Sequence, residues 1–310
     1  MLKYVLKRIV MIIPVVLAVS FIVFFIMGFV PSDPAVTVLG DGATEQQIEY
    51  YRETHGLNDP LPVRYVRYMA GIAKGDLGTS YAQNRPVWDI FFEKFPNTFK
   101  LAIASVIVTV LLSIPLGILA AVKNNTWIDT ICSTLSFVGL AMPNFWLGLL
   151  LIILFSVNLH WLPSTGAVGF KSLILPAITC GTGNMAALTR ITRSSMLDVL
   201  RQDYLRTARA KGQSEGMIIT HHAFKNAQIP VVTQVGIQMS TLLGGAVLTE
   251  RVFAWPGVGA FLVDSIQKSD FEVVTGFVIM LAIFVSIILL IVDVVYAFLD
   301  PRIKAQYSKG

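Results

Sequence analysis

The sequence predicts an all-α membrane protein with six transmembrane helices, and two observations lead to this class. The hydrophobic fraction is 55%, the charged fraction is 14% and the mean hydropathy is +0.68 over 310 residues, far from the composition of a soluble domain. The apolar residues also fall into six runs. Most reach the roughly 20 residues that a helix needs to cross about 30 Å of hydrocarbon. The runs are 9–30, 98–122, 131–157, 173–188, 230–248 and 273–299.

The first run is expected to be a retained transmembrane helix rather than a cleaved signal peptide. It follows a positive segment with Lys3, Lys7 and Arg8, as the hydrophobic region of a signal peptide does. A secretory hydrophobic region, however, is about 7 to 15 residues long and ends at a small-residue cleavage site. The run 9–30 is longer and continues without interruption. We therefore expect a signal anchor whose N-terminus lies in the cytoplasm.

Residues 31–97 form the first long polar segment, and we expect them to fold as a compact extracytoplasmic cap. Turn signals separate two short helical patterns, at 44–55 and 63–72. Thr44 is placed to cap the first of these helices, with Gln47 as its capping-box partner. The segment has no cluster of His, Cys and carboxylate residues of the kind that indicates catalysis.

The fourth and fifth runs carry polar residues. Asn184 and nearby glycines interrupt the fourth run, which is the weakest of the six. In the fifth run, Gln234, Gln238 and Thr241 recur with Gly245 at helical spacing, so they form one polar stripe. Polar groups are costly in lipid, and the stripe should therefore face protein or water. It either lines a translocation path or packs helices through interhelical hydrogen bonds, and the sequence leaves both interpretations open.

Residues 190–229 form a basic, helix-prone segment between the fourth and fifth runs. Lys and Arg gather here and at both ends of the chain, whereas the segment 31–97 has more acids than bases. Because translocation of positive charge is disfavoured, the basic segment and both termini are expected in the cytoplasm. Gly212 is expected to end one helix and to turn the chain into a second short helix at 215–226. Such a segment is typical of a docking surface for a soluble partner.

A series of short motifs occurs in order along most of the chain. Each is weak alone, but together their order and spacing are specific. They are Pro31-Ser32-Asp33-Pro34, Gly56-Leu57-Asn58-Asp59-Pro60-Leu61, Gly75-Asp76-Leu77-Gly78-Thr79-Ser80, Arg85-Pro86-Val87, Arg206-Thr207-Ala208 with Gly212, His222-Ala223-Phe224-Lys225-Asn226-Ala227-Gln228-Ile229-Pro230, Glu250-Arg251-Val252-Phe253-Ala254-Trp255-Pro256-Gly257-Val258-Gly259, and Asp300-Pro301.

With these motifs the chain resembles the membrane-spanning permeases of ABC importers, in their dipeptide, oligopeptide and nickel branch. The resemblance implies a type I ABC importer permease fold in two parts. Residues 1–97 would be an N-terminal transmembrane helix plus an extracytoplasmic segment. Residues 98–310 would be a core five-helix permease domain with a cytoplasmic coupling loop at 190–229.

The cytoplasmic motif of the wider superfamily begins with Glu, and this chain has Arg206 at that position, as the peptide branch does. Asp203 lies about one helical turn earlier and could present a carboxylate on a neighbouring face. The coupling residues implied by the resemblance are Asp203, Arg206, Thr207, Ala208 and Gly212. The candidate residues of the substrate pathway are Asn184, Gln234, Gln238 and Thr241.

The resemblance also implies partners in the cell membrane, the inner or plasma membrane. They are a second, related permease chain, two cytoplasmic ATPase subunits and an extracytoplasmic substrate-binding protein. The ATPase subunits would bind ATP and Mg, since this chain has no Gly-x-x-x-x-Gly-Lys-Ser/Thr segment. We therefore expect a transport subunit that is not itself an enzyme and binds no cofactor. Nucleic-acid binding is not expected, because the positive residues lie between apolar runs.

Asp293, His221 and His222 invite sharper hypotheses. Asp293 lies inside an apolar run, where an acid could relay protons. It is near the cytoplasmic end of its helix without a second acid or His, so a capping or salt-bridge role is favoured. Adjacent residues on a helix point in different directions, and the two histidines are therefore expected at the surface rather than on a metal. No metal site and no catalytic residue is predicted.

The cysteines and three of the tryptophans have ordinary structural explanations. Cys132 and Cys180 lie next to or inside apolar runs and are expected to pack as small apolar residues. Trp146, Trp161 and Trp255 fall near the ends of predicted spans, where interfacial anchoring is the usual role.

The substrate is expected to be a di- or oligopeptide. A path lined by uncharged amides and hydroxyls suits varied peptides better than a coordinated metal. Nickel and glutathione import are the alternatives within the same family. A secondary transporter driven by an ion gradient would show buried ionisable residues and an inverted repeat, and neither is clear. A membrane-embedded enzyme would need a clustered nucleophile and base, which the sequence does not show.

Overall fold

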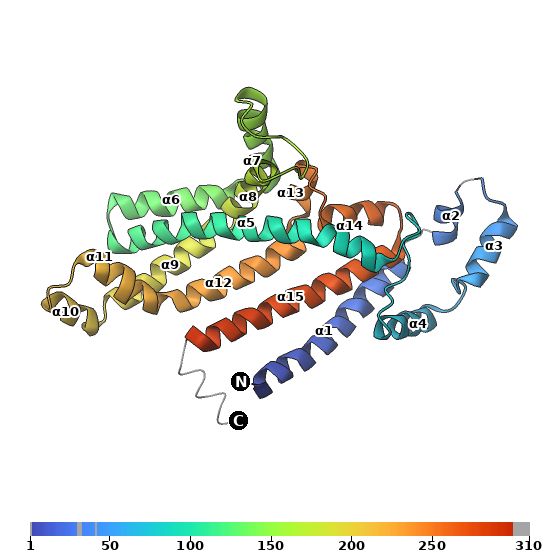
Figure 1. Cartoon of the computed structure of the whole chain (residues 1–310), viewed down its shortest axis with the longest axis horizontal. Helices are drawn as coiled ribbons and strands as arrows, with labels where there is room; N and C mark the ends of the chain where they lie inside the picture. Colours follow the sequence, from blue (N-terminus) through green and yellow to red (C-terminus); the bar gives the residue numbers. More distant parts are fainter. Residues whose placement is uncertain (1, 30–32, 41, 300–310) are drawn as a thin grey trace. The chain divides into compact units, whose positions relative to one another are not determined.

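The computed structural model describes residues 2–29, 33–40 and 42–299, and their regular structure is helical apart from one isolated bridge between Thr79 and Pro86 (Figure 1). Two of the helices, η1 and η2, are π-helices. The helices are α1 (Leu2–Gly28), α2 (Pro34–Leu39), α3 (Glu45–Thr54), α4 (Leu61–Ala73), α5 (Val87–Val122), α6 (Trp127–Ala141), α7 (Asn144–Leu151), η1 (Ile152–Asn158), α8 (Lys171–Gly183), α9 (Met185–Leu200), α10 (Asp203–Ala210), α11 (Glu215–Met217), η2 (Ile218–Ala223), α12 (Phe224–Gly245), α13 (Val247–Val252), α14 (Val258–Gln267) and α15 (Phe271–Leu299).

The chain folds into two compact units. The first unit contains Phe99–Trp255 together with segments from both ends of the chain. The second unit contains Leu6–Thr98 and Pro256–Ile287. Helices α5 and α15 each contribute residues to both units, because each continues without a break across a unit boundary.

The first unit is built on the contact of α9 with α12, and α6 packs against α8 and α9. Small residues allow this close approach. A Cβ atom at Gly139 would lie 2.8 Å from the carbonyl oxygen of Thr182, and one at Gly181 would lie 2.9 Å from the carbonyl oxygen of Ser105. Thr109 then donates a hydrogen bond of 2.8 Å to the carbonyl of Gly181. Glycine at helix contacts is the usual packing solution in a bilayer.

By length and apolar composition, three helices among the described residues can cross a membrane, namely Arg8–Gly28, Val87–Val122 and Phe271–Val295. Trp127–Ala141 and Asn144–Asn158 form a fourth candidate that is bent by 97°. These criteria do not select the fourth and fifth predicted runs. The reason is that α8 ends at Gly183 after 13 residues, whereas α12 carries the amides of Gln234 and Gln238.

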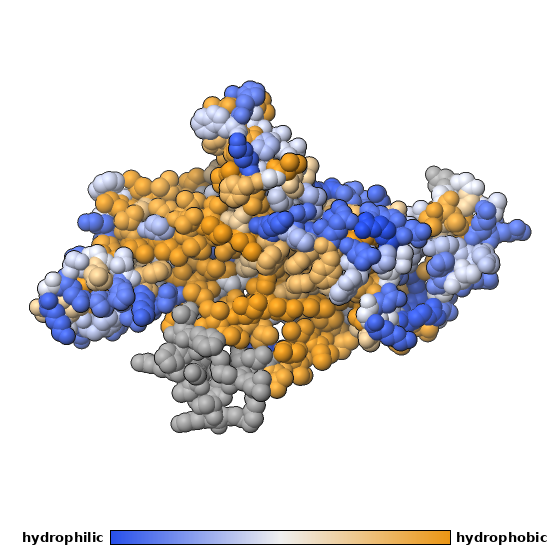
Figure 2. Space-filling model, in the orientation of Figure 1, coloured by the Kyte–Doolittle hydropathy of each residue, from blue (hydrophilic) through white to orange (hydrophobic). Residues whose placement is uncertain are grey.

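The surface matches a membrane location for the long helices. Figure 2 shows hydrophobic residues over these helices, and hydrophilic residues over α10 and α11 and over α2 to α4. Large apolar side chains are exposed there, such as Leu111 on α5 and Leu135 on α6. An apolar helix surface of this kind is stable in hydrocarbon, where the backbone hydrogen bonds are already satisfied within the helix.

In the second unit, an aromatic cluster joins α1, α4 and the start of α15. Phe24 packs edge-on against Phe271 at 5.0 Å and against Tyr65 at 5.4 Å between ring centroids. The Ser20 hydroxyl is 3.0 Å from that of Tyr65. Ser20 is fully buried, and this bond supplies a polar partner in an otherwise apolar contact.

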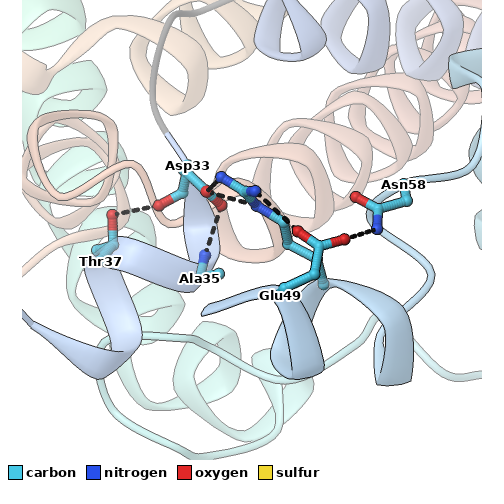
Figure 3. Close-up of polar contacts among 6 residues, drawn as sticks. Asp33, Ala35, Thr37, Glu49 and Asn58 are labelled. Carbon is cyan, nitrogen blue, oxygen red and sulfur yellow. Dashed lines mark hydrogen bonds and ion pairs between the residues drawn. The ribbon is translucent and has the colours of Figure 1, made fainter. Parts of the chain in front are cut away.

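The expected helices of the polar segment after α1 are confirmed as α3 and α4. Thr44 caps α3 with the predicted capping box: its hydroxyl accepts from the Gln47 N–H at 3.3 Å, and the Gln47 side chain accepts from the Thr44 N–H at 2.9 Å. Arg52 on α3 then bridges Asp33, at the start of α2, to Glu49 (Figure 3). These bonds tie α2 to α3.

The expectation of a separate second helix at 215–226 is wrong. The chain turns at Gly212 and begins α11 at Glu215, but this helix continues through η2 into α12 without a break. Pro230 lies inside α12 rather than closing a loop. The helical pattern of 215–226 is therefore the N-terminal extension of the fifth predicted run, and of the two short helices expected here only α10 is separate.

Candidate coupling helix and helix breaks

Leu205 is the buried side chain through which helix α10 packs on the rest of the first unit. Leu205 is fully buried in a cluster with Met196 of α9 and with Ile218 and Ala223 of η2. Burial of a leucine stabilises the folded state by about 1.5–3 kcal/mol. In a helix of eight residues this contact fixes which face points inward. Leu205 was not among the residues predicted from the sequence. Its signal there is a large apolar side chain in a polar helix, with Ala208 three residues further on.

The opposite face of α10 is open to solvent. The side chains of Asp203 and Arg206 are 94% and 81% exposed, and Thr207 is exposed as well. The carboxylate of Asp203 and the guanidinium of Arg206 approach within 3.7 Å, a contact that contributes little at such exposure. Ala208 differs from these three, because it is half-buried and packs against the Leu205 cluster. Of the predicted coupling residues, Asp203, Arg206 and Thr207 therefore share the outer face, and Ala208 belongs to the inner one.

The C-terminus of α10 ends as predicted at Gly212, in a Schellman motif. The N–H of Gly212 donates to the carbonyl of Arg209 at 2.9 Å, and the N–H of Gln213 donates to the carbonyl of Ala208 at 3.4 Å. Gly212 has a φ of +77°, which is costly for any residue with a side chain. A Cβ atom there would touch nothing within 4 Å, so the requirement for glycine comes from the backbone alone.

Two polar contacts brace α10 against α11 and α12. The side-chain amide of Asn226 donates to the Tyr204 hydroxyl at 2.9 Å and to the His222 carbonyl at 2.9 Å. Across the turn at Gly212, Nε of Arg209 donates to Glu215 at 2.7 Å. This guanidinium lowers the pKa of the Glu215 carboxyl, which favours its charged form. The helix is thus held at its start, middle and end.

A bidentate ion pair joins α9 to α6. Arg193 donates through Nε and Nη2 to the two carboxylate oxygens of Asp129 on α6, both at 2.7 Å. Nη2 also donates to the side-chain oxygen of Asn124 at 2.8 Å, and the N–H of Asn125 donates to Asp129 at 3.0 Å. Asp129 is buried, so this pair joins α9 firmly to the turn between α5 and α6.

A second polar site lies where two helices are broken. The N–H of Asn184 donates to the carbonyl of Gly181 at 3.3 Å, and its side-chain amide donates to the carbonyl of Cys180 at 3.1 Å. The break between α6 and α7 lies next to Asn184. The evidence is the side chain of Asn144, the first residue of α7: a Cβ at Gly183 would lie 2.7 Å from its Oδ1. The break in α6–α7 and the break in α8–α9 therefore meet. Sequence analysis did not identify Asn144, whose only signal is its place after Pro143.

Gln238 of α12 reaches the same helix breaks. Its Nε2 donates to the backbone oxygen of Asn184 at 3.1 Å. The residue is 2% exposed, and its Oε1 is buried without a hydrogen-bond partner. Thr241, in contrast, is exposed and donates to the carbonyl of Ile237, and Gln234 is partly buried. The structure therefore brings together Asn184 and Gln238, and it does not bring the other two predicted pathway residues to them.

The predicted surface positions of Trp255 and His222 are wrong. Trp255 is 4% exposed and buried, so it is not an interfacial anchor, whereas Trp146 and Trp161 are exposed. His222 is partly buried with its Nε2 enclosed, and only His221 lies at the surface. The extended π-helix η2 turns the His222 ring toward the interior, an orientation that α-helical spacing does not predict.

Cys132 and Cys180 are buried and free, as predicted. Asp293 is partly buried in α15, and its role stays a prediction. The motif residues 31, 32, 300 and 301 and the C-terminal tail lie outside the described residues.

Comparison with known families decides the classification. Residues 113–305 match the family described as binding-protein-dependent transport system inner membrane component. Residues 1–102 match the family described as the N-terminal part of such membrane components. The chain belongs to this permease family. It is a multi-pass inner-membrane transport subunit of the peptide and glutathione group of ABC importers.

Individual relatives cover nearly the whole permease. The glutathione transport system permease protein GsiC of Salmonella paratyphi A is 43% identical over 304 residues, which are 98% of this chain and 99% of the relative. The dipeptide transport system permease protein DppB of Alkalihalophilus pseudofirmus is 40% identical over an alignment of 332 positions, gaps included, which covers 98% of this chain and 100% of the relative.

A solved structure shares the permease fold. A chain of the MetNI methionine ABC transporter, in an inward-facing conformation, matches with a TM-score of 0.56 at 16% identity. The match covers 68% of this chain and 96% of that chain. The permease therefore has the all-helical fold of an ABC transporter membrane domain.

Proposed function

We propose that this permease forms half of the translocation path of an ATP-driven importer of di- and oligopeptides. A second, related permease chain forms the other half, and an extracytoplasmic binding protein delivers the substrate. Two cytoplasmic ATPase subunits bind ATP and Mg and supply the energy. The observation that carries the proposal is α10, a short helix with a charged outer face that is fixed to the bundle on its inner face.

Helix α10 is suited to transmit a force because each of its parts has a separate attachment. Leu205 packs inward, Gly212 closes the C-terminal turn, and Asn226 holds Tyr204. Asp203, Arg206 and Thr207 remain exposed for an ATPase cleft. Movement of that cleft would carry α10 as a rigid body and, through the cluster around Met196, move α9 and α12.

The proposed permease has the type I fold with six spans, of which one precedes the cap and five form the core at 98–310. The fourth span consists of α8 and α9, which are interrupted by Asn184 alone. The fifth span is α12, whose 22 residues would extend about 33 Å at about 1.5 Å per residue. The coupling loop then lies in the cytoplasm together with both termini.

The polar side chains at the helix breaks could form hydrogen bonds with the backbone of a peptide. The amides of Asn144, Asn184 and Gln238 are uncharged, and the unpartnered Oε1 of Gln238 can accept a hydrogen bond from a peptide N–H. Glutathione is a second candidate, because relatives 43% identical to this chain bear the name glutathione permease. Nickel fits less well, since amide groups are weak competitors for a transition metal.

The proposed function is tested by uptake into proteoliposomes that contain the permease, its partner permease and both ATPase subunits. Labelled dialanine, with its binding protein, is expected to accumulate only when ATP is present on the ATPase side. Accumulation should persist after ionophores collapse the proton and sodium gradients. Uptake without ATPase subunits, or uptake that ionophores abolish, would instead indicate a secondary transporter. Glutathione and a labelled pentapeptide in parallel reactions would define the substrate range.

A second expected result concerns Gln238. Replacement by leucine removes the amide at the helix breaks, and dialanine uptake should fall about tenfold, the factor that corresponds to about 1.4 kcal/mol. The exposed Ile237→Leu variant on the same helix is the matched control and should transport normally. If Gln238 only packs helices, Gln238→Leu should lower the thermal stability of the complex and reduce uptake of dialanine and glutathione by the same factor. A pathway role predicts different factors for the two substrates.

A further inference from the structure

Two adjoining cavities lie in the second unit, where residues of the polar segment after α1 and the start of α15 line them. The smaller has a volume of about 190 Å³ and the larger about 680 Å³. Both are lined by His55, Gly78, Tyr81 and Glu272. The larger volume falls within the roughly 300–1,000 Å³ that is usual for small-molecule sites. The proposed translocation path does not use either cavity.

Glu272 is the chemical centre of this site. Its Oε1 accepts a hydrogen bond of 3.0 Å from the Tyr81 hydroxyl, but its Oε2 is fully enclosed and has no hydrogen-bond partner. A Cβ atom at Gly78 would lie only 2.3 Å from this Oε2. The lack of a side chain at Gly78 therefore makes room for the carboxylate oxygen itself, which packs against the backbone there. A buried carboxylate oxygen without a donor is costly, and such a group calls for a cationic or hydrogen-bonding guest.

The other groups around Glu272 suit a cation. The Tyr68 hydroxyl lines the smaller cavity and also has no hydrogen-bond partner. Burial raises the pKa values of Tyr68 and Tyr81 well above the usual range, so both hydroxyls stay protonated. The oxygen of Tyr68 can accept a hydrogen bond, while Tyr81 already donates to Glu272. The rings of Phe24 and Phe271 line the same cavity and offer π faces.

The lining of the smaller cavity also has a positive pole, in addition to the acidic one at Glu272. Arg64 and Arg67 also line the smaller cavity. The Arg64 guanidinium lies 5.6 Å from the centre of the Phe271 ring, and Arg67 donates to Asp59. A ligand with an ammonium group at one end and a carboxylate or carbonyl oxygens at the other would match both poles. A simple anion would be repelled by Glu272. A divalent metal ion takes roughly six or more oxygen ligands, and the described residues contain no group of three or more His, Cys, Asp or Glu side chains placed to hold a metal ion.

We propose that these cavities bind the ammonium end of a short peptide, with the N-terminal –NH₃⁺ donating to Oε2 of Glu272 and to the Tyr68 hydroxyl. The site would recognise the free amino terminus that di- and oligopeptides share whatever their side chains. Arg64 would face the carbonyl oxygens or the carboxylate of the same ligand. This inference rests on the proposed function for its choice of peptide over other amines.

The test measures equilibrium binding of labelled dialanine and of N-acetyl-dialanine to the full transporter complex in nanodiscs, without binding protein and without nucleotide. Acetylation removes the positive charge but keeps the rest of the ligand. For the wild type, acetylation is expected to weaken binding about tenfold or more, the loss of one charge-assisted hydrogen bond. Glu272→Gln keeps the shape of the side chain. It should reduce the ratio of the two dissociation constants, that of N-acetyl-dialanine over that of dialanine, to about one. Tyr68→Phe should reduce it in part.

Glu53→Gln is the matched control, because it makes the same chemical change at an exposed position of α3 that lines neither cavity. It should keep the full ratio. Equal binding of both ligands to the wild type, or an unchanged ratio in Glu272→Gln, would overturn the inference. ATP-dependent uptake, measured on the same preparations, tests the proposed function separately. Uptake that persists together with an unchanged ratio contradicts only the peptide site, whereas loss of ATP-dependent uptake in the wild type contradicts the importer.

Discussion

Replacing Gly212 by valine is expected to uncouple transport from ATP hydrolysis. The position has a φ of +77°. A residue with a side chain there destabilises the folded state by about 1–2 kcal/mol, and a β-branched residue by more. The Schellman turn after α10 should then open, and α10 should lose its fixed angle to α12. Peptide uptake by the reconstituted complex is expected to fall about tenfold or more while ATPase activity continues.

The chain offers two controls for this experiment. Gly216 lies four residues further on with an ordinary φ, and a Cβ there would also touch nothing within 4 Å. Gly216→Val therefore adds the same side chain without the backbone strain and should remain coupled. Gly212→Asn should retain most of the coupling, because asparagine tolerates the left-handed conformation. Equal defects in Gly212→Val and Gly216→Val would show that added bulk, rather than the turn, is harmful.

Breaking the ion pair between Asp129 and Arg193 is expected to destabilise the permease strongly. Loss of one partner from a buried pair costs about 3–5 kcal/mol, and we expect about 2–4 kcal/mol here because the Arg193 side chain is 30% exposed. Asp129→Asn and Arg193→Gln should each lower the thermal stability of the purified complex. They should also weaken coupling, because the pair fixes α9, from which α10 extends.

A double-mutant cycle separates the pair from its surroundings. If the two residues act through each other, the double variant should be less destabilised than the sum of the single variants. Asp198→Asn on the exposed side of α9 is the control and should change stability by less than about 0.5 kcal/mol. Additive losses in the cycle would mean that each residue stabilises the fold through other contacts.

Local signals in the sequence predicted local structure well. The capping box of Thr44 and Gln47, the glycine turn at 212 and the buried free cysteines all depend on residues close in sequence or on composition. The long apolar runs also predicted the helices α1, α5 and α15, because membrane spans are set by length and hydropathy.

Contacts between distant residues could not be predicted in this way. Asp129 and Arg193 are 64 residues apart, and nothing in the sequence indicates that they form a bidentate pair. The sequence does not indicate a role for Asn144. The bend between α6 and α7 brings it next to Gly183. Trp255 was assigned to the membrane interface from its place near the end of a predicted span, and His222 was assigned to the surface. Both are wrong because sequence position does not reveal which side chains pack inward.

The sequence by itself determined that this protein is a helical membrane permease, since composition, apolar run length and motif order are properties of the chain. Only the tertiary structure decided which residues of α10 face outward, that two helix breaks meet at Gln238, and that Glu272 lies enclosed beside Gly78. The physical reason is that burial and hydrogen-bond partners depend on which helices pack together. That packing depends on close approach at residues such as Gly139 and Gly181, and these contacts bring together residues far apart in the chain.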